Sequence, residues 1–218
     1  MNDPRTIRVT GKGMIRLKPD TTCITVTLDG ISKVYAETLK RSAADTEQIR
    51  SVLTEIGFAR DELKTLSFRV EPEYEGYQED GIYKQRLVGY RFIHEMKIEF
   101  PSDNERLGQI LTALAGTALA PEFQIGYTVK DREAAKNALI GMAVADAKAK
   151  AAALTDAAGV KLLGIRHIEY SLCEIDLEVH PGRLFSMKRA VNEDCISPEI
   201  EPEEITAEDS VTIDWEIE

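Results

Sequence analysis

The amino-acid sequence predicts an α+β fold in which helices pack on a mostly antiparallel sheet. Segments with alternating apolar and polar residues, typical of half-buried strands, recur along the 218 residues. Two segments with the apolar spacing of amphipathic helices lie between these strands. A much longer helical segment follows, over residues 132–158. Together they predict the order β-α-β-β-α-β, then one long Ala-rich helix and two further strands.

The first strand-like segment spans residues 7–30, and Gly11, Gly13 and Pro19 interrupt it, which predicts bulges or a bend. The glycines on either side of Lys12 could also suggest a phosphate loop. The other glycines of such a loop are missing and a strand pattern follows, so the sequence disfavours a nucleotide site.

A helix capped by Ser32 is predicted over residues 33–56. Its predicted buried face consists of Ala36, Leu39, Ala43, Ile49, Val52, Leu53 and Ile56. Strands over residues 63–74 and 87–100, joined by an acidic, glycine-containing turn at 75–81, should form a hairpin. The second strand should bury Tyr90, Phe92, His94, Met96, Ile98 and Phe100.

A short helix capped by Ser102 or Asp103 should run to about Ala115. Its predicted inward residues are Leu107, Ile110, Leu111 and Leu114. A strand over residues 122–129 then completes the β-α-β-β-α-β order, which is the ferredoxin-like pattern.

The long helix should begin after Asp131 and end at Gly159, and twelve of its 27 residues are alanine. Two apolar seams lie on nearly opposite sides of it. The first seam is Ala135, Ala138, Met142, Ala145, Ala149 and Ala152, and the second is Ile140, Val144, Ala147, Ala151 and Leu154. A helix on a sheet needs one apolar face, so the other should meet a second helix or another subunit, unless its alanines are simply solvated.

Beyond the long helix we expect a strand over residues 164–179, an irregular acidic loop at about 180–204, and a last strand over 205–217. Residues 1–218 are predicted to form a single domain, whose length allows a sizeable core.

The formal net charge is −11, and all of this excess comes from residues 193–218, which contain no Lys or Arg. The absence of a basic stripe argues against a nucleic-acid partner. Residues 193–209 could attract a basic protein partner. Alternatively, the acidic end is a solvated loop and an edge strand that keep the protein soluble.

No apolar run reaches the roughly 20 residues that a membrane-spanning helix needs, so no membrane insertion is expected. The chain begins without an apolar leader, which predicts a cytoplasmic protein. Cys23, Cys173 and Cys195 are an odd number, which fits reduced thiols, and they lack metal-ligand spacing.

His94 and His167 lie within predicted strands and are interpreted as packed core histidines, although a Cys–His pair that includes Cys173 stays open. One strand face carries a candidate cation-binding set of Glu174, Asp176, Glu178 and His180. A solvent-facing strand edge explains that set equally well. Since GxSxG, HExxH and P-loop motifs are absent, no catalytic, cofactor-binding or metal-ligating residue is assigned.

Six stretches in their order resemble the SIMPL domain family, which includes bacterial periplasmic immunogenic proteins. They are IRVTGKGMIRLKPDTTCITVTL, LTEIGFARDELKT, VGYRFIHEMKIEF, FQIGYTVKD, REAAKNALIGMAVADAKAKAAALTDAAGVKLLGI and IEPEEITAEDSVTIDWEIE. The resemblance implies an α+β, oligomer-forming domain without established enzymatic activity or cofactor. It further implies a link to stress resistance or to adaptor behaviour. The chain departs from the bacterial pattern in lacking an export signal, which disfavours a periplasmic role.

The leading hypothesis is a non-enzymatic, homo-oligomeric, cytoplasmic protein that acts as a scaffold or stress-related factor. The second is an adaptor that binds a basic protein through its acidic C-terminal segment. The third is a small-ligand or metal-binding protein that uses Glu174, Asp176 and Glu178.

Overall fold

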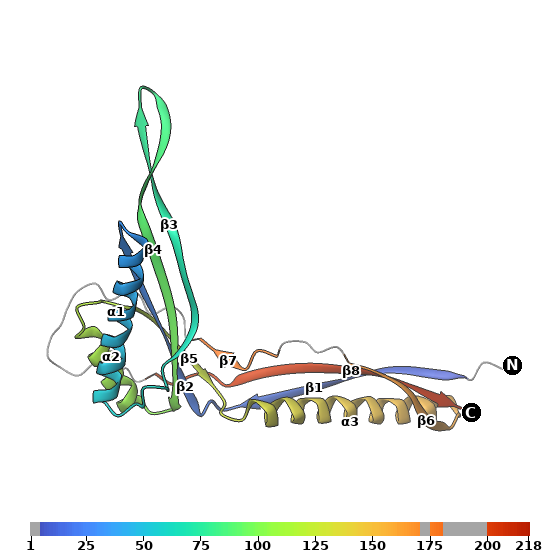
Figure 1. Ribbon diagram of the computed structural model, residues 1–218. Coiled ribbons are helices and arrows are strands. Elements are labelled where there is room, and N and C mark those ends of the chain that lie inside the picture. Colours follow the sequence, from blue (N-terminus) through green and yellow to red (C-terminus); the bar gives the residue numbers. More distant parts are fainter. Residues whose placement is uncertain (1–4, 171–174, 181–199) are drawn as a thin grey trace. The chain divides into compact units, whose positions relative to one another are not determined.

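A computed structural model describes residues 5–170, 175–180 and 200–218 (Figure 1). The chain divides into two compact units. Unit 1 comprises Met1–Asp20, Thr128–Val179 and Glu203–Glu218, and unit 2 comprises Thr21–Tyr127 and His180–Pro202. Helices and antiparallel strands occur in the described part of the chain, which confirms the α+β class. The prediction of a single domain stays a prediction.

Unit 2 contains six elements in the order β-α-β-β-α-β. They are β2 (Thr21–Ser32), α1 (Tyr35–Glu55), β3 (Lys64–Glu79), β4 (Ile82–Pro101), α2 (Asn104–Ala115) and β5 (Glu122–Thr128). The strands lie side by side in the order β3-β4-β2-β5, and β4 is antiparallel to both β2 and β3. Both helices pack on this sheet over a core of large apolar side chains, among them Ile24, Phe92, Ile98 and Leu114 (Figure 1).

Unit 1 is built from one long helix and a second sheet. Its elements are β1 (Thr6–Leu17), α3 (Arg132–Ala158), β6 (Leu162–Glu169), β7 (Glu178–Val179) and β8 (Ile205–Ile217). The sheet has the order β1-β8-β6, with β8 antiparallel to both neighbours, and α3 runs along β1 and β8 (Figure 1). Beside the end of β5, the Thr128 hydroxyl donates to the carbonyl of Leu177 at 2.8 Å.

The predicted strand over residues 7–30 is two strands of two different sheets. β1 ends at Leu17 and β2 begins at Thr21, on either side of Pro19. Proline has no N–H for a strand ladder. The backbone N–H of Asp20 instead donates to the carbonyl of Thr128, and its carboxylate accepts from the Lys130 amide. The interruption was predicted as a bulge or bend, and the change of sheet was missed.

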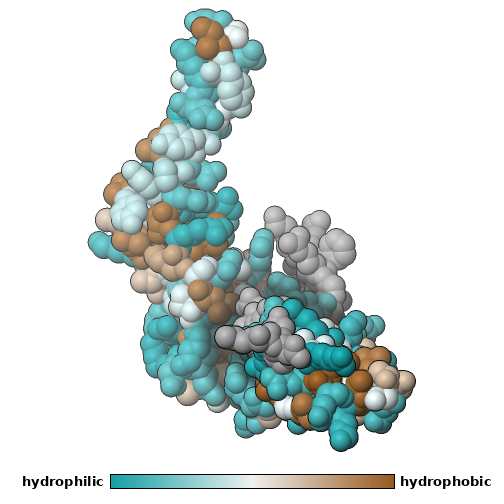
Figure 2. Space-filling model, turned by 90° about the vertical axis from the view of Figure 1, so that its right-hand side faces the viewer, coloured by the Kyte–Doolittle hydropathy of each residue, from teal (hydrophilic) through white to brown (hydrophobic). Residues whose placement is uncertain are grey.

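The predicted hairpin of β3 and β4 is confirmed, but the predicted turn at 75–81 is wrong. β3 continues to Glu79, and only Asp80 and Gly81 connect it to β4. Both have positive φ, 52° and 76°, as a two-residue turn between twisted strands requires. The hairpin rises beyond α1 in Figure 1, and Figure 2 shows apolar surface at its tip. The predicted buried face of β4 is confirmed from Phe92 to Phe100.

The first helix differs from its prediction at its start and over its first half. α1 begins at Tyr35 with Val34 as N-cap, so the predicted Ser32 cap is wrong. Its buried residues are Thr38, Ser42, Thr46, Ile49 and Leu53. Three residues of the predicted face, Ala36, Leu39 and Ala43, are exposed. The Thr38 hydroxyl lies 3.2 Å from the carbonyls of Val34 and Tyr90, so hydrogen bonding allows a polar residue to face the sheet.

The ends of the other helices follow from their caps. The Asp103 side chain accepts from the amides of Glu105 and Arg106 at the start of α2. Asp131 caps α3 in the same way, and Gly159 ends it with a φ of 68°. Both helices therefore confirm their predictions.

The strands after α3 confirm only part of their prediction. β8 has the predicted bounds, but it is the central strand of its sheet, so the interpretation as an edge strand is wrong. The strand predicted over 164–179 ends at Glu169, and only β7 follows before residue 180 in the described part. The described chain thus has three strands after α3, where the sequence predicted two.

Candidate functional site

The contact between α3 and β1 explains the two glycines of the first strand. A Cβ atom on Gly11 would lie 2.1 Å from the carbonyl oxygen of Ala143, and one on Gly13 would lie 2.2 Å from that of Leu139. No side chain fits at such distances, so glycine lets the helix backbone lie directly on the strand. The two glycines therefore allow close packing of α3 on β1. This role explains them without a phosphate loop.

Burial on α3 follows a stripe with a spacing of four residues. Its buried residues are Ala135, Leu139, Ala143, Ala147, Ala151 and Thr155. This stripe shares two residues with the predicted second seam, Ala147 and Ala151, and one with the first, Ala135. Four residues turn an α-helix by about 400°, which is about 40° more than one full turn. The stripe therefore moves gradually around the helix as it follows the sheet. Neither predicted seam alone is therefore the packed face.

The opposite side of α3 is an exposed apolar surface, which we call the outer seam. It consists of Ala138, Met142, Ala145, Ala149 and Ala152, all of which are exposed. The Met142 residue is 46% exposed. The outer seam is the first predicted seam without Ala135. That a second helix or another subunit covers it stays a prediction.

Charged groups lie along one edge of the outer seam and are engaged with one another. Lys150 Nζ lies 2.6 Å from Asp146 Oδ2, which also accepts from the backbone N–H of Lys12 at 2.7 Å. The hydrogen bond from Lys150, then that from Lys12, lowers the pKa of Asp146. These contacts tie the helix to β1 and leave the seam itself without a charged side chain.

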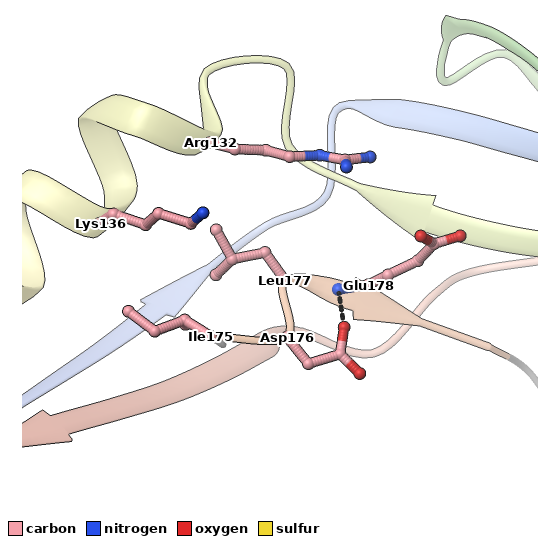
Figure 3. Close-up of a pocket in the computed structure, with 6 residues that line it drawn as sticks. All are labelled: Arg132, Lys136, Ile175, Asp176, Leu177 and Glu178. Carbon is pink, nitrogen blue, oxygen red and sulfur yellow. Dashed lines mark hydrogen bonds between the residues drawn. The ribbon is translucent and has the colours of Figure 1, made fainter. Parts of the chain in front are cut away.

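A hollow of about 490 Å³ lies at the start of α3 (Figure 3). Arg132, Lys136, Ile175, Asp176, Leu177 and Glu178 line it. The Asp176 carboxylate accepts from the Glu178 amide at 2.9 Å and points away from Arg132 and Lys136 (Figure 3). Of the predicted cation set, Glu174 lies outside the described residues and His180 is exposed. No group of three metal-ligating side chains gathers within the described ranges.

His94 is a packed core histidine, as predicted. It is 8% exposed, and its two ring nitrogens lie 3.0 Å from the hydroxyls of Thr46 and Thr65. The Phe68 ring meets it edge-on at 5.2 Å. Burial, followed by the nearby charge of Arg50, lowers the pKa of His94 below its ordinary value of 6.5. The neutral imidazole therefore bridges two hydroxyls inside unit 2.

The other candidate side chains lie apart from one another. His167 is exposed on β6, opposite Asp214 of β8, so its interpretation as a core residue is wrong. Cys23 is buried, and its sulfur lies 3.6 Å from Glu99 Oε1. Cys173 and Cys195 lie outside the described residues, and so does the Cys–His pair that would include Cys173.

The acidic C-terminal segment is described from residue 200 onwards. Glu201, Glu203, Glu204 and Glu208 are exposed. Asp209 is buried and accepts a hydrogen bond from the Tyr170 hydroxyl at 2.8 Å. The part of the predicted partner-binding segment before residue 200 lies outside the described residues.

Among the described helices, none is long and apolar enough to cross a membrane. No curated protein matches the chain. The family model of SIMPL, described as a protein of unknown function (DUF541), matches residues 7–215. This match covers both units and all the elements described above, apart from a few terminal residues. The chain therefore belongs to the SIMPL family.

Proposed function

We propose that this chain is a non-enzymatic, cytoplasmic protein that assembles with copies of itself through the outer seam of α3. The observation that supports the proposal is the exposed seam, which extends over four turns of the helix without a charged side chain. The scaffold or stress-related role rests on the family resemblance. The reduced state expected for its three cysteines supports the cytoplasmic location.

The chemistry of the seam supports a second copy of the helix as its partner. On its buried side, α3 already uses alanines to approach a backbone closely, as the contact with Gly11 demonstrates. The outer seam repeats small residues at steps of three and four, with Met142 as a flexible apolar side chain among them. A second α3 could pack against this surface without burying an unpaired charge.

The test replaces one seam alanine with a charged residue. Ala145→Glu or Ala149→Glu should lower the molar mass measured by light scattering after gel filtration, because a carboxylate would be buried between helices. The circular dichroism spectrum should stay unchanged, since both alanines are exposed within the chain.

Two control variants separate assembly from folding. Ala147→Glu places the same charge on the buried side, where the residue is fully buried, and should unfold unit 1. Lys148→Glu changes an exposed residue off the seam and should leave the mass unchanged. An Ala145→Glu protein that keeps the full mass of the wild type would exclude assembly through the seam.

A second candidate function is an adaptor that binds a basic protein. The exposed carboxylates of Glu201, Glu203, Glu204 and Glu208 favour it. Replacing these four residues with glutamine should abolish capture of a basic partner in a pull-down, and capture by the wild type should weaken with salt. Binding that does not respond to salt would exclude this role for the segment.

A further inference from the structure

The outer part of the β3–β4 hairpin, residues 73–89, forms what we call the arm. Towards the tip of the hairpin, the pairing of β4 with β2 ends at Tyr90, which lies opposite Ser32. Within the arm, β4 therefore pairs only with β3, and β3 is the outermost strand of its sheet. Neither edge of the arm pairs with another described strand. A two-stranded ribbon is marginal by itself, and open edges favour the addition of further strands.

The two faces of the arm differ in charge. One face carries the ion pairs Glu75–Arg86 and Glu79–Lys84, at 2.7 and 2.6 Å. The other face has no charged side chain: it consists of Tyr74, Gly76, Gln78, Tyr83, Gln85 and Leu87. On it, Tyr74 is 55% and Tyr83 74% exposed, and the Tyr83 ring lies over Gly76. The uncharged face thus exposes two tyrosines and Leu87 beside its two glutamines.

The two strands of the arm also carry opposite charges. Its β3 half contains only acidic charges, Glu73, Glu75 and Glu79, and its β4 half contains only basic ones, Lys84 and Arg86. Two β3 edges brought together would place carboxylates opposite one another, and two β4 edges would do the same with cations. Such like-charge pairs destabilise a sheet, whereas opposite charges stabilise it. The arm therefore favours pairing between unlike edges.

We propose that arms of neighbouring copies join edge to edge, with β4 of one copy pairing with β3 of the next. This inference rests on the proposed self-assembly and adds a second contact to it. β3 runs towards the tip and β4 runs away from it, so arms that point the same way pair antiparallel. Residues at equal distance from the tip then face each other, which brings Glu75 next to Arg86 of the following copy.

Two consequences follow from pairing unlike edges. The contact is heterologous, because different surfaces of the two copies meet, so it continues into a ring or an open array. Edge pairing also hydrogen-bonds more backbone groups than a single hairpin can. It places the uncharged faces of successive arms side by side, around Tyr74, Tyr83 and Leu87.

The first experiment measures whether the arm contributes to assembly. Residues 74–87 are replaced with an Asn-Gly turn in the full chain, and the molar mass is compared with that of the wild type by light scattering. We expect an assembly with fewer copies of the chain and an unchanged circular dichroism signal from the helices. An unchanged number of copies would overturn the arm contact but leave assembly through α3 intact. A wild type that is monomeric throughout would overturn both proposals.

The second experiment tests the polarity of the pairing with a charge-swapped variant: Glu75→Arg, Glu79→Lys, Lys84→Glu and Arg86→Glu. The swap preserves the opposite charges within each arm, so the hairpin should fold. Swapped chains should also pair with one another, whereas their β3 and β4 edges should repel the β4 and β3 edges of the wild type.

Isotope-labelled mixtures give the readout. A carbodiimide joins neighbouring carboxylates and amines, and mass spectrometry of a ¹⁴N/¹⁵N mixture detects links between chains. In wild type alone we expect mixed-isotope links from Lys84 to Glu75 or Glu79. In swapped chains alone we expect the reverse links, from position 79 of one chain to position 84 or 86 of another. If assembly depends on residues 74–87 but Lys84 of the wild type forms no mixed-isotope link to Glu75 or Glu79, the proposed pairing of β4 with β3 is overturned.

Discussion

Each unit packs helical structure on a sheet, but the two units fill the space between helix and sheet with different side chains. Unit 2 uses large apolar residues such as Phe92, Met96 and Leu114, all fully buried. In unit 1, glycines of β1 meet alanines of α3, and the helix backbone lies almost directly on the strand. Large residues such as Trp215 contribute to that core only beside this contact. Close backbone approach therefore substitutes for side-chain volume along α3.

This difference bears on assembly. A helix that packs through small residues leaves most of its circumference outside the core, and in α3 the outer seam is as rich in alanine as the buried stripe. A helix such as α2 buries Leu107, Ile110, Leu111 and Leu114 on one face. Its exposed residues include Glu105, Gln109 and Thr112. The comparison supports the proposal that assembly involves α3 rather than α2.

The largest expected effect is the loss of a large side chain from unit 2. Phe92→Ala should destabilise the protein by about 4 kcal/mol, because it leaves a cavity between the sheet and its helices. Leu66→Ala in β3 is the matched control, since Leu66 is 54% exposed and should cost little. Chemical denaturation followed by circular dichroism measures both. Equal losses in the two variants would contradict the description of this core.

Adding one methyl group to β1 should have the next largest effect. Gly11→Ala should destabilise unit 1 by about 2 kcal/mol, because the new Cβ meets the backbone of Ala143 and the helix must move away. Gly141→Ala is the control: a Cβ there has no neighbour within 4 Å, and alanine favours the helix. Thermal unfolding that is unaffected by Gly11→Ala would show that the contact is loose.

A smaller effect concerns pH and the core of unit 2. Because burial lowers the pKa of His94, the unfolded chain takes up a proton at a higher pH than the folded chain does. The stability contributed by neutral His94 is complete above its ordinary pKa of 6.5 and decreases as the pH falls below it. Denaturation from pH 8 to about 5 should show a steeper loss for wild type than for His94→Gln. Parallel curves would contradict this.

The parts of the fold that were predictable have strong local signals. Asp131, Gly159 and the regular apolar spacing between them define α3 to the residue. Asp103 is one of the two N-caps predicted for α2, and strict alternation defines β8. Each of these signals is contained in a few neighbouring residues, so no knowledge of the tertiary structure is needed to read it.

The missed features depend on contacts between distant residues. The buried stripe of α1 contains Thr38 and Thr46. Both can face inwards because the Thr38 hydroxyl donates to the carbonyl of Tyr90 and the Thr46 hydroxyl is hydrogen-bonded to the His94 ring. The length of the hairpin was missed because its outer half has no buried face to produce an alternating pattern. The packing role of Gly11 and Gly13 had a readable signal, a Gly-x-Gly strand in a chain with an Ala-rich helix. Only the structure shows that the two meet.

The proposed self-assembly is tested most directly by the molar mass of the wild-type chain in solution. Light scattering over a range of micromolar concentrations should give a multiple of the 24.3 kDa chain mass. The same measurement on Ala145→Glu should give a smaller value, with secondary structure unchanged. A wild type that stays at 24.3 kDa at every concentration would contradict the account.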